Sequence, residues 1–102
     1  MFKFVGKVGD KNWVCEIYED TVSGMDFAVC YFLGKKHKVP VMIPAVEFET
    51  CSRKVFENYP LPKPLLSKLL RECVKIKRKK MALGLEREFV EKLVRGELAK
   101  FK

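Results

Sequence analysis

Apolar side chains recur with a helical period over residues 65–83, the most strongly patterned stretch of the chain. At 100° per residue, seven apolar positions fall on one half of a helical wheel: Leu65, Leu66, Leu69, Leu70, Cys73, Val74 and Ile76. The opposite half is largely cationic. Lys77 and Lys80 return to the apolar side, so we expect the helix to leave the core or end soon after Ile76. The pattern predicts an amphipathic helix with a basic outer face.

A second apolar stripe follows Gly84, the residue type that most often closes a helix. Its apolar positions are Leu85, Phe89, Val90, Leu93, Val94, Leu98 and Phe101. Three alternate prolines at 60–64 enforce an extended connector before the first helix. We therefore predict a two-helix hairpin over residues 65–101.

The N-terminal half, residues 1–59, has mainly the pattern of β-structure. Residues 2–8 and 12–19 alternate apolar and polar side chains around a turn at 9–11, which predicts a β-hairpin. In the first strand, Phe2, Phe4 and Val8 are expected on one face and Lys3 and Lys7 on the other. In the second strand, Trp13, Cys15 and Ile17 are expected to point inward.

Two further segments complete the predicted sheet. Residues 26–33 are apolar on both faces, which favours a central strand covered on both sides, although capping-box spacing at Ser23 leaves a short helix open. Residues 38–43 read as an extended segment, and Pro40 and Pro44 confine it to a sheet edge.

Length and composition fit one domain, residues 1–102, with nearly half of its residues apolar. We predict an α+β fold: a small antiparallel sheet of three to five strands from the N-terminal half, with two C-terminal amphipathic helices packed on one face. No apolar run approaches the roughly 20 residues of a membrane span, and the N-terminus lacks the apolar core of a signal peptide. A cytoplasmic location is expected.

The net charge of +8 is concentrated in one segment. Residues 1–60 hold eight basic and eight acidic side chains, whereas residues 61–83 hold eight basic side chains against Glu72 alone, a local charge of +7. Such a concentration is typical of an anion-facing surface rather than of a uniformly basic protein.

This basic helix face is the strongest functional signal in the sequence. Its cations would follow a phosphate backbone by releasing counterions, so we predict a small, non-catalytic nucleic-acid-binding protein, with DNA and RNA both open. The expected phosphate contacts are Lys68, Arg71, Lys75, Arg78, Lys79 and Lys80. A secondary contact is expected from Lys35, Lys36 and Lys38 in the loop around His37. The plainer alternative is a solvated helix face.

The alternative function is a protein-interaction module that binds a peptide or an acidic partner in a groove or along an exposed strand edge. Its basis is the edge segment 38–43, together with Met81 and Leu83, apolar residues that follow the basic turn. A membrane partner is not expected, because the apolar face of the helix can pack against the sheet and the second helix instead of a membrane surface. The oligomeric state stays open.

Aromatic side chains in the predicted strands raise the prospect of base stacking, with Trp13, Tyr18, Tyr31 and Phe32 as candidates. Core packing is the favoured explanation, because the strands must bury at least one face under the helices.

The cysteines are Cys15, Cys30, Cys51 and Cys73. No two of them have the short gap of a zinc knuckle and His37 is the only histidine, so no metal site is predicted. Cys15 and Cys30 fall on neighbouring strands, where they could form a disulfide or remain buried thiols. Cys73 is expected to pack in the core.

The composition also suggests the source. The chain has no glutamine and only two asparagines, while Lys, Arg and Glu are abundant. Depletion of thermolabile amides with enrichment of charge is typical of hyperthermophiles, so we predict a hyperthermophilic archaeon or one of its viruses. Intracellular disulfides are common in such organisms.

Catalysis is not supported by the sequence. The best carboxylates are Asp20, Asp26, Glu47 and Glu49, of which Glu47 and Glu49 would share a strand face. A metal-dependent nuclease could use such a pair, but no lysine is placed beside it to complete the site. The sequence has no nucleophile elbow, phosphate-binding glycine loop or HExxH motif, so we predict no enzyme and no cofactor.

Overall fold

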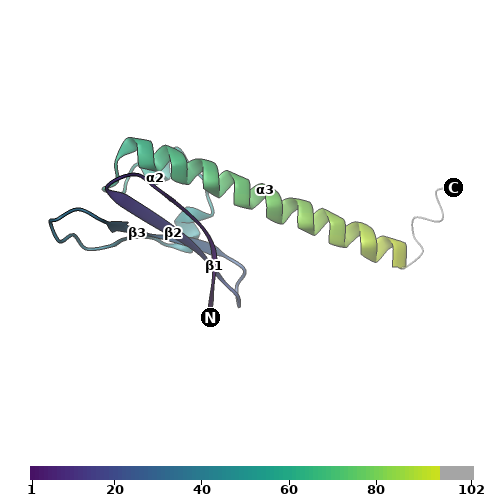
Figure 1. Ribbon diagram of the computed structural model, residues 1–102. Helices are drawn as coiled ribbons and strands as arrows, with labels where there is room; N and C mark the ends of the chain where they lie inside the picture. The colour runs from purple at the N-terminus through teal and green to yellow at the C-terminus, as the bar shows by residue number, and fades with distance from the viewer. Residues whose placement is uncertain (95–102) are drawn as a thin grey trace.

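The computed structural model describes residues 1–94 as a four-stranded antiparallel sheet with helices on one of its faces (Figure 1). The strands lie in the order β1-β2-β3-β4, and their bounds are Phe2–Gly9, Trp13–Asp20, Asp26–Phe32 and Val41–Ile43. The helices are α1 (Ala45–Phe48), α2 (Arg53–Phe56) and α3 (Lys63–Val94). The predicted α+β class is confirmed.

β1 and β2 form the predicted hairpin, but a bulge changes which side chains of β1 face the core. The register with β2 shifts between Phe4 and Gly6, where Val5 is the extra residue. A one-residue offset turns the following side chains to the other face. Phe2 and Phe4 therefore point away from the helices, whereas Val8 packs against the core. The prediction that these three residues share one face was wrong.

β2 and β3 supply most of the inward side of the sheet. Trp13, Cys15 and Ile17 are buried, as predicted. β3 is a strand rather than a short helix, and it pairs with β2 along its whole length. Its outward side chains lie on the face opposite to the described helices (Figure 1), so the expectation that both faces of β3 are covered was wrong for the described residues. β4 is a three-residue edge strand, as its flanking prolines predict.

Two single-turn helices, α1 and α2, connect β4 to α3. The Ser52 hydroxyl caps α2 by accepting a hydrogen bond from the backbone N–H of Val55, at 3.4 Å. Between the two helices the chain turns at Cys51, whose φ is 45°. The rings of Phe48 and Phe56 are buried and stack with their centres 5.7 Å apart, so each short helix places one large side chain in the core.

One hydrophobic core lies between the sheet and the helices, with Leu65 and Leu69 of α3 fully buried. Two disulfides cross-link it. Cys15–Cys30 joins β2 to β3, and Cys51–Cys73 joins the α1–α2 turn to α3. Cys73 is buried in the core as predicted, and it also cross-links α3 to the α1–α2 turn.

α3 is one continuous helix of 32 residues, about 48 Å long. It passes through Gly84, so the prediction of two helices joined there was wrong. A glycine closes a helix when the chain beyond it turns back, but α3 instead projects past the sheet (Figure 1). Residues 95–101 of the predicted second helix lie outside the described part.

Candidate functional site

Four exposed cations of α3 form a surface that we call the basic stripe: Arg71, Lys75, Arg78 and Lys79. They surround a shallow hollow whose floor includes the half-buried Leu70. Among the side chains that the structure describes, no carboxylate forms an ion pair with any of the four. The sequence-predicted basic helix face is therefore present in the structure.

The other two predicted phosphate contacts, Lys68 and Lys80, are bonded to the sheet. The ammonium of Lys68 donates to the carbonyl oxygen of Gly9, 2.9 Å away at the β1–β2 turn. The ammonium of Lys80 donates to the carbonyl oxygen of Gly24, 2.6 Å away at the β2–β3 turn. Since these turns lie at opposite ends of the strands, the two lysines fix α3 along the sheet.

Lys80 also neutralises a buried carboxylate. Its Nζ lies 2.7 Å from Oδ2 of Asp26 and 3.0 Å from Oε2 of Glu19. Burial raises the pKa of Asp26, and the opposing effect of Lys80 is smaller. Burial lowers the pKa of Lys80, but the two carboxylates outweigh it, so the pKa of Lys80 is raised and its ammonium stays charged. Lys80 therefore has a structural role, and its ammonium is not available to contact phosphate.

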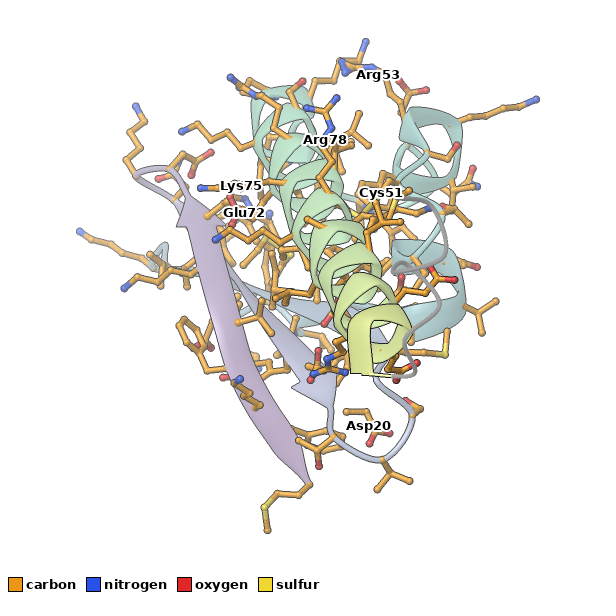
Figure 2. The ribbon with its side chains drawn as sticks, turned by 90° about the vertical axis from the view of Figure 1, so that its right-hand side faces the viewer. Asp20, Cys51, Arg53, Glu72, Lys75 and Arg78 are labelled. Atoms are coloured by element: carbon orange, nitrogen blue, oxygen red, sulfur yellow. A yellow bond between two sulfur atoms is a disulfide. The ribbon has the colours of Figure 1, made fainter. Side chains whose placement is uncertain are left out.

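A groove runs between β1 and α3 beside the basic stripe; we call it the β1–α3 groove (Figure 2). Lys3 lines it from β1, and Glu72, Lys75 and Lys79 line it from α3. Figure 2 shows Glu72 and Lys75 on the side of α3 that faces β1, whereas Arg78 does not point toward β1. Sequence reasoning missed Lys3, because only the packing of β1 beside α3 brings it to these cations.

The predicted secondary loop is not joined to the basic stripe. The ammonium of Lys38 lies 4.4 Å from the ring centre of Phe32 and 5.7 Å from that of Trp13, the geometry of a cation–π contact. Lys35 and Lys36 are exposed, and in the described part of the chain no hydrogen bond or ion pair links them to α3. Lys38 therefore packs against these two rings.

The outward side of the sheet carries a cluster of rings that we call the aromatic face: Phe2, Phe4, Tyr18, Phe27 and Tyr31. Phe2 contacts Phe27 edge-on, with ring centres 5.2 Å apart, and Phe4 contacts Tyr18 in the same way at 5.8 Å. Phe2 and Phe4 are 63% and 51% exposed. The described helices all lie on the opposite face (Figure 1).

The four stacking candidates from the sequence divide between the two faces. Trp13 and Phe32 pack together on the core side, with ring centres 5.2 Å apart, as core packing predicts. Tyr18 and Tyr31 lie on the aromatic face instead. Phe2 and Phe4 were missed because the bulge in β1 was not foreseen; Gly6 directly after it was the available hint. Phe27 was missed because both faces of β3 were expected to be covered.

The carboxylates considered for catalysis are engaged in structural hydrogen bonds. Asp20 accepts backbone N–H groups in its own turn, which lowers the pKa of its carboxyl. Glu47 accepts from the Tyr59 hydroxyl, and Glu49 accepts from the backbone N–H of Asp26 at 2.7 Å. Glu47 lies in α1 and Glu49 caps it, so the prediction of a shared strand face was wrong. Where side chains are described, no three potential metal ligands lie close enough to hold an ion.

Comparison of the chain with known protein families, curated proteins and solved structures finds no match. Among the described helices, none has the length and apolar character needed to cross a membrane. The described residues present three surfaces suited to binding: the basic stripe, the β1–α3 groove and the aromatic face.

Proposed function

We propose that this protein binds nucleic acid without catalysis, using the basic stripe to contact phosphates. The observation that carries the proposal is a set of adjacent cations held on one helix, none of which pairs with a carboxylate among the described side chains. From Arg71 to Lys79 the stripe extends about 12 Å along the helix axis, long enough to contact more than one phosphate. Contacts of this kind position a protein on nucleic acid without reading its sequence.

Anchoring of α3 supports the same proposal. Lys68 and Lys80 hold the helix to the two ends of the sheet, and the Cys51–Cys73 disulfide fixes it from the other side. A held helix keeps its cations in place before the ligand arrives, which lowers the entropy lost on binding. The carboxylates engaged in turns and caps favour a binding function over a hydrolytic one.

The predicted source bears on the compartment. Two disulfides in a cytoplasmic protein are typical of hyperthermophiles and rare elsewhere. The proposals of a hyperthermophilic archaeal or viral source and of a cytoplasmic location, in the host if the source is viral, therefore depend on each other.

Fluorescence anisotropy with labelled single-stranded and duplex DNA, at low and moderate salt, tests the proposed function. The test variant changes Lys75, Arg78 and Lys79 to Glu. The matched control changes Lys11, Lys54 and Lys63 to Glu, three exposed cations away from the stripe with the same change in net charge. We expect native and control proteins to bind with steep salt dependence and the test variant to lose binding. Absence of binding by the folded native protein at low salt would exclude the proposal.

A protein-interaction module remains the second candidate. Met81, Leu83 and Leu85 are 63%, 54% and 65% exposed on α3, which favours an apolar partner. The predicted edge segment supplies only the short β4, whereas β1 is an edge strand of eight residues. This candidate gains support if neither form of DNA binds to the folded native protein.

A further inference from the structure

We propose that the ligand is a single-stranded nucleic acid that crosses the β1 edge, with its phosphates in the β1–α3 groove and its bases stacked on the aromatic face. This inference rests on the proposed function and specifies its substrate class. It assigns a role to five aromatic rings that neither the core nor the basic stripe explains.

Phe2 and Phe4 are exposed, and the rings that they contact, Phe27 and Tyr18, are half-buried. Phe2 leans edge-on against Phe27 and Phe4 against Tyr18, while Tyr18 and Phe27 stack with ring centres 5.9 Å apart. These contacts restrict the motion of the four rings, of which Phe2 and Phe4 are the more exposed to solvent. Every base has a π-face, so such rings bind unpaired bases with little dependence on sequence.

The base and phosphate sites meet on a single strand. Successive residues of a strand point to opposite faces, so Lys3 lies on the groove side between Phe2 and Phe4, which point outward. Phe4 also borders the groove. An extended strand at this edge can direct its phosphates toward Lys3 and its bases toward the flanking rings.

Charge in the groove suits an anionic chain rather than a second copy of this basic protein. Four lysines line the groove, Lys3, Lys75, Lys79 and Lys80, against two glutamates, Glu19 and Glu72. Lys3, Lys75 and Lys79 form no ion pair with any described side chain, whereas Lys80 is shared between Glu19 and Asp26. A duplex satisfies the cations but keeps its base faces stacked inside, so it gains nothing from the aromatic face. Preference for single strands follows from this difference.

The test compares two variants on two ligands. The ring variant carries Phe2→Thr and Phe4→Thr, which retain strand-forming residues at exposed positions. The control carries Val39→Thr and Val46→Thr, 77% and 76% exposed in the native protein and outside the aromatic face. The ligands are a labelled oligothymidylate of about 20 nucleotides and a duplex of the same length, and circular dichroism checks the fold of each protein.

We expect the ring variant to bind the oligothymidylate about 30-fold more weakly, from the loss of two stacked bases, and to bind the duplex as the native protein does. The control should match the native protein on both ligands. If the native protein and the ring variant bind single strands equally, or native binding is no tighter for single strands than for duplex, the inference fails while the proposed function stands. If the native protein binds neither ligand, both fail. A native dimer that the ring substitutions convert to monomer, seen by sedimentation, would also overturn the inference, since a second copy would then cover the rings.

Discussion

The ammonium of Lys80 lies 2.7 Å from Oδ2 of Asp26. The last lysine of the basic segment 61–83 therefore pairs with a buried carboxylate instead of facing solvent. Asp26 is 2% exposed, and its second oxygen, Oδ1, has no hydrogen-bond partner in the described part of the molecule. Removing the lysine would leave a buried carboxylate without its counter-ion, a costly arrangement.

Lys80→Met should therefore lower the free energy of unfolding by about 1–3 kcal/mol, a range reduced because the Lys80 side chain is 35% exposed. Lys79→Met, one residue earlier on the exposed side, should change it by less than about 0.5 kcal/mol. Urea unfolding of the two variants measures the difference. Equal effects would show that the ion pair does not anchor α3.

Replacing Gly84 by alanine should stabilise the C-terminal part of α3. A Cβ at this position would meet nothing within 4 Å, and alanine favours a helix interior by about 1 kcal/mol over glycine. Amide hydrogen exchange in residues 81–94 should slow in the variant. Gly24→Ala is the contrasting control. Gly24 has a φ of 74°, which alanine adopts only with strain, so this substitution should lower the free energy of unfolding of the protein. Unchanged or faster exchange in Gly84→Ala would indicate that the helix ends at the glycine.

Both disulfides should be present in the native protein. Alkylation under denaturing conditions, followed by intact mass measurement, should label no cysteine before reduction and all four afterwards. Changing Cys51 and Cys73 together to serine should lower the free energy of unfolding by about 2–4 kcal/mol, because the unfolded chain loses a constraint. Cysteines that react without reductant would contradict the cross-links.

Stability should fall in alkaline solution. Burial and the hydrogen bond to Glu47 raise the pKa of Tyr59 from 10.0 to about 12. The unfolded chain therefore loses this proton at a lower pH than the folded protein, so stability decreases as the pH rises from 10 toward 12. The raised pKa of Lys80 acts in the same direction above 10.5. Thermal unfolding followed from pH 8 upward should show the decline, and Tyr59→Phe should flatten it. An equal decline in the variant would exclude Tyr59 as a contributor.

The sequence predicts the elements of this fold better than the relations between them. The hairpin and the amphipathic start of α3 follow from periodicity, because their apolar positions repeat over several residues. β3 was favoured on its apolar composition alone, which left a short helix open. The bulge at Val5 is a local departure from that period. It places Phe2 and Phe4 on the opposite face of the sheet from Val8, and one extra residue is too short to be recognised as a pattern in the sequence. Gly84 likewise has the identity of a helix cap, but only tertiary contacts decide whether the chain turns there.

The candidate site shows the same division. The cations of the basic stripe share one helix, so their common face was predictable from a helical wheel. Lys80 and Asp26 are 54 residues apart in sequence and come together only when α3 crosses the sheet. Lys3 and Lys75 share a groove for the same reason. Spacing along the chain cannot reveal such pairs.

The salt dependence of DNA binding tests the central proposal most directly. We would compare the native protein with a variant in which Lys75, Arg78 and Lys79 are alanine, and with a control in which Lys11, Lys54 and Lys63 are alanine. Each phosphate contact adds about 0.7–0.9 to the slope of log binding constant against log salt, so the stripe variant should show a slope smaller by about 2 and the control should match the native protein. Equal slopes in all three proteins would mean that the basic stripe does not contact phosphates.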